Sequence, residues 1–187
     1  MVGITAAAAV NIAPTILWNM SPRPSSRPVS DAQRTDPEAA RAAAVSLLAR
    51  RDLASGELRA RLAARGFVPD AAREAVQGLV REGVVNDERY ARNYVAYHAR
   101  RGQGPVRIAL LLRGLGVEAA LAAAALADGP DWVALARQVR QARFGARPPA
   151  GWPERARQGR FLQYRGFSSD HIRAATGADP DTGPTEP

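Results

Sequence analysis

One short pattern occurs three times in this chain at equal intervals, and it constrains the fold more than any other feature. In each copy a leucine is followed, four and five residues later, by a glycine and an apolar residue. The copies begin at Leu62, Leu112 and Leu162, each 50 residues after the one before. The pattern is typical of a helix end, where glycine turns left-handed and the next apolar side chain folds back onto the leucine. A unit that recurs at this period predicts a repeat protein.

The residues around the first copy predict three helices, near 37–51, 55–65 and 69–82. Helix caps and the spacing of apolar residues set these boundaries. Ser55 is expected to cap the second helix with its side chain, and Pro69 suits the first position of the third. The first repeat is therefore expected to be a unit of three helices.

The second repeat follows the same plan. Asn86 is expected to cap its first helix. Asp87 and Glu88 fall in the first turn, where their carboxylates complement the helix dipole, and this is preferred to reading them as a catalytic pair. A glycine-rich turn over 102–105 leads into the next helix, and a third helix is expected to continue to Asp128.

The third repeat departs from the other two in one connection. Its first helix begins after Asp131, the chain breaks at Pro148 and Pro149, and helix restarts at Pro153. Ser168 is expected to cap a short last helix. Because no segment alternates apolar and polar residues as a strand would, the predicted fold class is all-α. We predict three tandem three-helix repeats that form an elongated, curved modular array.

The same signals divide the chain into five parts. We expect a disordered N-terminal extension over 1–36, which contains a stretch rich in Pro, Ser and Arg. Helical repeats are expected over 37–85, 86–130 and 131–177. A flexible polar tail is expected over 178–187.

The charge of the chain points to an anionic partner. The net charge is +8, and all 26 basic residues are arginine. Codon bias explains the choice of arginine over lysine, but it does not explain the excess of positive over negative charge. Such an excess favours a nucleic acid or an acidic protein groove through long-range attraction.

The residue types that the chain lacks argue against enzymatic chemistry. Without lysine there is no phosphate-loop lysine or Schiff base, and without cysteine there is no thiol nucleophile or thiolate ligand. Neither His98 nor His171 has the spacing of a metal ligand pair. The turn 102–104 is too short for a nucleotide-binding loop. We therefore expect no enzyme, no metal and no cofactor.

The first residues do not suggest export. Residues 4–18 are apolar, but no basic residue precedes them, as one would in a secretory signal. The stretch is also short of the roughly 20 residues that span a bilayer. We expect a cytoplasmic protein that does not interact with membranes.

Four segments in order resemble the RecX family of recombinase regulators. They are 55–67, 83–94, 101–108 and 160–168, and the resemblance extends over about 37–177. Residues 1–36 match nothing in the family, and Gln103 stands where a lysine is common.

The resemblance implies a bacterial cytoplasmic protein that binds the RecA recombinase filament along its helical groove. It implies restraint of filament extension, ATP hydrolysis and strand exchange, in DNA repair, recombination and the SOS response. Family members also bind DNA themselves, and we expect this chain to be a monomer. Two alternatives stay open: an independent DNA-binding protein without sequence specificity, and a helical scaffold for another partner.

Arginines are the candidate contact residues. Arg50 and Arg51 lie 50 residues before Arg100 and Arg101, so two equivalent pairs would present evenly spaced charge to a periodic anionic surface. Stabilisation of a helix C-terminus is the alternative explanation for both pairs. Arginine also suits bidentate contact with carboxylate or phosphate, and this adds five further candidates, most of which are expected to lie on solvated faces. The further candidates are Arg59, Arg65, Arg92, Arg107 and Arg113.

Most aromatic residues fall on apolar stripes or helix ends, so their expected role is core packing. Tyr97 and Tyr164 are less clearly directed inward.

Overall fold

The structure, a computed structural model, describes residues 30–177. The expected extension up to residue 29 and the expected tail 178–187 lie outside the described residues. A short helix, α1 (Asp31–Arg34), falls inside the segment expected to be disordered. The described fold therefore begins before the predicted boundary at residue 37.

The described residues form helices and no strand. The first repeat contains α2 (Pro37–Leu48), α3 (Ser55–Ala64) and α4 (Pro69–Arg81). The second contains α5 (Asp87–Arg100), α6 (Pro105–Gly114) and α7 (Ala119–Ala127). The third contains α8 (Trp132–Phe144), α9 (Trp152–Arg165) and α10 (Ser169–Thr176). The prediction of an all-α array of three-helix repeats is confirmed.

The repeated pattern ends the middle helix of each repeat in the same way. Gly66, Gly116 and Gly166 have φ angles of +99°, +75° and +90°. The apolar residue after each glycine donates its backbone N–H to the carbonyl of the leucine, at 3.1–3.2 Å, and all three leucines are fully buried. This is the helix end that the sequence predicts.

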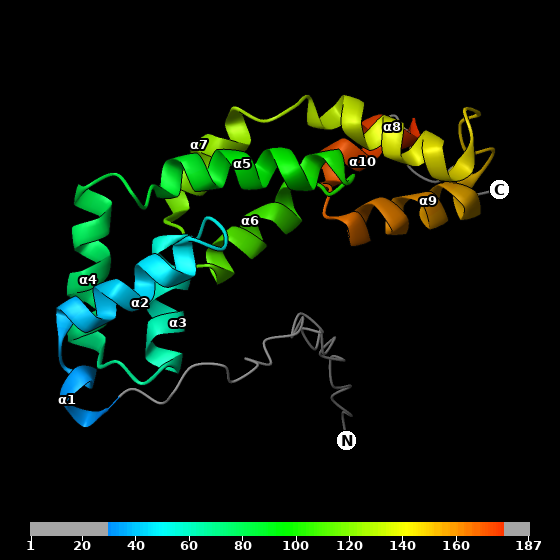
Figure 1. Cartoon of the computed structure of the whole chain (residues 1–187). Coiled ribbons are helices and arrows are strands. Elements are labelled where there is room, and N and C mark those ends of the chain that lie inside the picture. The colour runs from blue at the N-terminus through cyan, green and yellow to red at the C-terminus, as the bar shows by residue number, and fades with distance from the viewer. Residues whose placement is uncertain (1–29, 178–187) are drawn as a thin grey trace, which may run out of the picture.

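Each repeat buries its own core. Three clusters of buried apolar side chains follow the three repeats along the chain, except that Ala54 of the first repeat and Trp132 of the third pack with the second cluster. The helix pairs that pack closely all belong to a single repeat. The array is consequently elongated, with the repeats in sequence order (Figure 1).

The repeats meet through their middle helices, which are joined end to end. The start of α3 lies on the end of α6, where a Cβ added to Gly56 would be 2.6 Å from the Cα of Gly116. The start of α6 lies on the end of α9 in the same way: Gly104 N–H donates to the Arg165 carbonyl at 2.8 Å. Since the amide end of one helix meets the carbonyl end of the next, the two helix dipoles attract each other.

The joint between repeats 1 and 2 also uses side chains, and here one prediction is wrong. The residue at the cap position of α3 is Ala54, and Ser55 does not cap its own helix. Instead the backbone N–H and the hydroxyl of Ser55 donate to the two carboxylate oxygens of Asp87, at 2.7 and 2.6 Å. The carboxylate of the second repeat thus caps a helix of the first.

Helix α1 covers the free end of the array. The Val68 N–H donates to the Arg34 carbonyl at 2.9 Å, and the Arg34 side chain lies beside Gly66. In the other two repeats the matching glycine receives the start of a neighbouring helix. Residues 30–36 therefore take the place of a preceding repeat.

A buried polar network holds the irregular connection of the third repeat. Arg140 is only 4% exposed, and its guanidinium donates to the carbonyls of Arg147 and Ala146 at 2.9 and 3.3 Å. The fully buried Gln158 donates to Glu154 at 3.1 Å. The third repeat thereby fixes loop 145–151 with polar groups, where the first repeat buries aliphatic side chains.

Candidate partner-binding surface

The structure separates the nine candidate arginines into two groups. Two of them form ion pairs, Arg51 with Glu57 and Arg92 with Glu88, and a third, Arg65, has no ion pair in the described part of the chain but donates to the carbonyl of Ala43. No carboxylate of residues 30–177 lies within 4.0 Å of the other six guanidinium groups. These six are Arg50, Arg59, Arg100, Arg101, Arg107 and Arg113.

The two arginine pairs are not equivalent in the structure. Arg100 is the last residue of α5 and Arg101 follows it directly, whereas α2 ends at Leu48 and both Arg50 and Arg51 lie beyond it. Only the second pair therefore sits at a helix C-terminus. The idea of two evenly spaced, equally available pairs does not fit this geometry.

Two candidates meet at the joint between repeats 2 and 3. At the end of α5, the Arg101 guanidinium donates to the Tyr97 hydroxyl at 2.9 Å and lies 5.4 Å from the centre of the Tyr97 ring. At the start of α6, the Arg107 guanidinium lies 5.6 Å from the centre of the Tyr164 ring and donates to the Tyr164 carbonyl at 3.3 Å. Each arginine is thus held beside a tyrosine of its own.

Arg165 connects these two arginine–tyrosine pairs. Its guanidinium donates to the Arg101 carbonyl at 3.2 Å, across the joint. We call the five residues Tyr97, Arg101, Arg107, Tyr164 and Arg165 the tyrosine–arginine surface. Three helices, α5, α6 and α9, converge there in Figure 1.

The surface is positive, and its two tyrosines are open to solvent, whereas Arg107 and Arg165 are half-buried. Tyr97 is 50% exposed and Tyr164 is 77% exposed. None of the three guanidinium groups has a carboxylate of residues 30–177 within 4.0 Å. Because no neighbouring carboxylate neutralises it, the positive charge at this joint can attract an anionic partner from solution.

His98 lies beside the tyrosine–arginine surface, with the centre of its ring 5.1 Å from that of Tyr97. The Nδ1 of His98 is hydrogen-bonded to the side-chain oxygen of Gln103 at 2.7 Å. The centre of the His98 ring lies 4.1 Å from that of the Tyr94 ring, and the two rings are tilted relative to each other. Burial lowers the pKa of His98 below its ordinary value, and the positive charges of Arg101 and Arg107 act in the same direction. Gln103 therefore has a structural role here, as the partner of His98.

The residues of this surface are suited to binding a partner. Arginine beside an exposed tyrosine can bind carboxylate or phosphate and can stack on flat groups. Among residues 30–177, no three His, Asp or Glu side chains are grouped so that they could hold a metal ion.

Arg165 was not among the predicted candidate residues, because it directly precedes the glycine of a helix end and has a structural explanation there. Tyr97 and Tyr164 were predicted only to be less clearly directed inward than the other aromatic residues, and no feature of the sequence placed them at one joint.

No single helix in the described part of the chain is long and apolar enough to cross a membrane. The pair α7 and α8 meets the length and composition requirement only when taken together, and it is bent by 73° at its break.

Three family models match the chain in order. They are described as the first, second and third three-helix domains of RecX, and they match residues 40–79, 86–126 and 131–176. The chain belongs to the RecX family. The resemblance seen in the sequence is thereby confirmed, and with it membership of a family of regulatory proteins.

Relatives within the RecX family cover most of the chain. A regulatory protein RecX from Halorhodospira halophila is 45% identical over 151 residues, 79% of this chain and 94% of that protein. One from a Pseudomonas fluorescens strain is 42% identical over 135 residues, 72% of this chain and 87% of that protein. The crystal structure of RecX from Lactobacillus salivarius aligns with a TM-score of 0.65 over 75% of this chain and 94% of that chain, at 23% identity. That last similarity concerns the fold alone.

Proposed function

We propose that this chain binds the RecA recombinase filament along its groove and inhibits filament extension, ATP hydrolysis and strand exchange. The observation that carries the proposal is the tyrosine–arginine surface, an uncompensated positive patch with two exposed tyrosines. Tyrosine and arginine are the residue types that most often dominate binding at protein interfaces. Regulatory membership of the RecX family is consistent with this role.

The shape of the array supports a long binding site. The repeats contact one another mainly at the joints between middle helices, so the chain is elongated and not globular. An elongated body can contact several subunits of a filament at once, and each added contact increases the overall affinity. We infer that the chain acts as a monomer in the cytoplasm, as the resemblance to the RecX family implies.

The test is a titration of RecA with the full chain on single-stranded DNA at low salt. We expect the DNA-dependent ATPase rate and the filament length to fall as the protein is added, and the effect to weaken as salt rises. If both stay unchanged up to equimolar protein, the proposal is wrong.

A second function is favoured by one feature of the same surface. Exposed aromatic rings beside arginines are the groups on which single-stranded nucleic acids stack. The chain would then bind DNA without RecA, and without sequence specificity, because an aromatic ring can stack on any base. The affinity for DNA, measured without RecA at several salt concentrations, separates the two functions. Binding that persists at physiological salt, and whose affinity falls steeply as salt rises, supports direct DNA binding.

A further inference from the structure

An apolar groove lies at the same joint but on the opposite side of α5. Its volume is about 770 Å³, within the range of roughly 300–1,000 Å³ that is typical of ligand-binding pockets. With 3.6 residues per turn, the side chains of Val95 and Ala99 point about half a turn away from those of Tyr97 and Arg101. The groove is therefore separate from the tyrosine–arginine surface.

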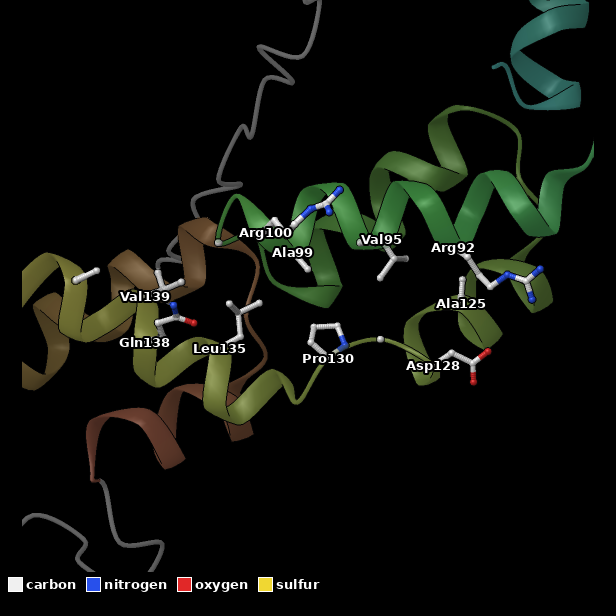
Figure 2. Close-up of a pocket in the computed structure, with 14 residues that line it drawn as sticks. Arg92, Val95, Ala99, Arg100, Ala125, Asp128, Pro130, Leu135, Gln138 and Val139 are labelled. Atoms are coloured by element: carbon white, nitrogen blue, oxygen red, sulfur yellow. The ribbon is translucent and has the colours of Figure 1, made fainter. Parts of the chain in front are cut away.

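Two repeats form the walls of this groove. Val95 and Ala99 of α5 line one wall, and Leu135 and Val139 of α8 line the other. Pro130, in the link between α7 and α8, lies between the walls (Figure 2). Because the walls belong to different repeats, the groove exists only while the joint is in place.

Charge is distributed unevenly along the groove. At one end Arg92 is paired with Glu88 at 2.8 Å, and Asp128 lies opposite (Figure 2). At the other end Arg100 is exposed, and no carboxylate of residues 30–177 lies within 4.0 Å of it. The Arg100 end is thus the positive one.

We propose that this groove binds a short amphipathic helix of a partner protein, with its apolar face in the groove and acidic residues beside Arg100. Arg92 and Arg100 are eight residues apart on α5, a distance of about 12 Å, which is slightly more than two turns of helix. Apolar side chains at positions i, i+4 and i+7 of the partner match that length. The inference does not depend on RecA as the partner.

The probe is a fluorescein-labelled peptide of about fourteen residues, with leucines at i, i+4 and i+7 and glutamates on one flank. A matched peptide carries lysines in place of the glutamates. Fluorescence anisotropy against the full chain is expected to show binding of the acidic peptide, and binding at least about tenfold weaker for the lysine peptide. Equal binding of the two peptides, or no binding of the acidic one, overturns the proposal.

Two variants place the site. Ala96 lines the groove but is exposed, so Ala96→Trp fills the groove without entering a core. We expect this variant, and separately Arg100→Glu, to weaken binding of the acidic peptide by about tenfold or more. The matched controls Ala123→Trp and Arg81→Glu lie on exposed positions outside the groove and should change binding less than about twofold.

A measurement on the unmodified chain locates the binding site without relying on variants that could fail to fold. Backbone amide NMR shifts on adding the acidic peptide should change most around Ala99 and Val139. Changes confined to other parts of the chain overturn the proposal, as does unchanged binding by a folded Ala96→Trp protein. Neither experiment contains RecA, so the outcome is distinct from that of the ATPase titration.

Discussion

The two joints of the array use the same contact between middle helices but are completed differently. At the first joint, the carboxylate of Asp87 caps the start of α3, and Arg89 lies 3.7 Å from Asp52. At the second joint the bonds run to backbone carbonyls: Val106 N–H donates to Gly166 at 3.0 Å, and arginine side chains donate to the carbonyls of other residues.

The two joints differ in whether the positive charge of their arginines is neutralised by carboxylates. Carboxylates neutralise several arginines of the first repeat, as in the pairs of Arg41 with Glu82 at 2.7 Å and Arg61 with Glu57 at 2.9 Å, although Arg50 and Arg59 have no such partner among residues 30–177. A carbonyl is a dipole without net charge, so the arginines at the second joint keep their full positive charge after bonding. The first joint is completed by a carboxylate, whereas the second leaves arginine charge uncompensated at the tyrosine–arginine surface.

Gly166→Ala should break the second joint and give the largest effect. A Cβ there would lie 2.2 Å from the Cβ of Arg107, in addition to the strain of a φ of +90°. We expect the free energy of unfolding to fall by about 3 kcal/mol or more in urea titrations. Gly66→Ala has the strain but only arginine side-chain atoms nearby, at 3.6 Å and beyond, so about 1–2 kcal/mol is expected. Equal losses would contradict the end-to-end joint.

Asp87→Ala should weaken the first joint. It removes the acceptor of two hydrogen bonds from Ser55, one of them from a backbone N–H at a helix start. We expect a loss of about 2 kcal/mol. Glu88→Ala is the matched control because its pair with Arg92 is exposed, and its loss should stay below about 1 kcal/mol. If the free energy of unfolding falls equally in the two variants, the cap between the repeats does not contribute more to stability than an exposed ion pair.

Acidification should destabilise the second joint through His98. The pKa of His98 is lowered in the fold, so between its folded and unfolded pKa values the unfolded chain binds more protons. Stability is therefore complete above the ordinary histidine pKa and is lost as the pH falls through and below it. The free energy of unfolding, measured from pH 8 to 5, should fall more steeply for the parent chain than for His98→Gln. Parallel curves would exclude this contribution.

Tyr164→Ala should have the smallest effect on stability. Its ring is largely exposed and contacts the guanidinium of Arg107. We expect a change in the free energy of unfolding of less than about 0.5 kcal/mol, together with a clear loss of partner binding. A large loss of stability would make the tyrosine a structural residue and remove it from the binding surface.

The helices could be predicted from the sequence because their signals are local. The recurring leucine–glycine pattern and caps such as Asn86 and Ser168 act within one turn of helix, and they place the helix ends within a few residues. The bond between Ser55 and Asp87 could not be found in this way, since its partners are 32 residues apart and each has a local explanation. The repeats could be recognised one by one, but the joints arise only when they are stacked.

The candidate site was predictable only in part for the same reason. Arg101 and Arg107 are close to each other in sequence and both were proposed, but Tyr164 and Arg165 reach them from the next repeat. Ion pairs decide which arginines remain available, as the contrast between Arg51 and Arg101 shows. Net charge alone does not reveal that distribution.

The central claim is that the second joint, rather than overall positive charge, binds the RecA filament. The direct test compares two double variants of the full chain by anisotropy of labelled RecA filaments: Arg101→Glu with Arg160→Glu, and Arg73→Glu with Arg81→Glu. Arg160 is exposed and lies one turn before Tyr164, whereas the control pair is in α4, and both variants change the net charge equally. We predict that the first variant loses at least about tenfold in filament affinity and that the second stays within about threefold of the parent chain. Equal losses in the two variants would contradict the claim.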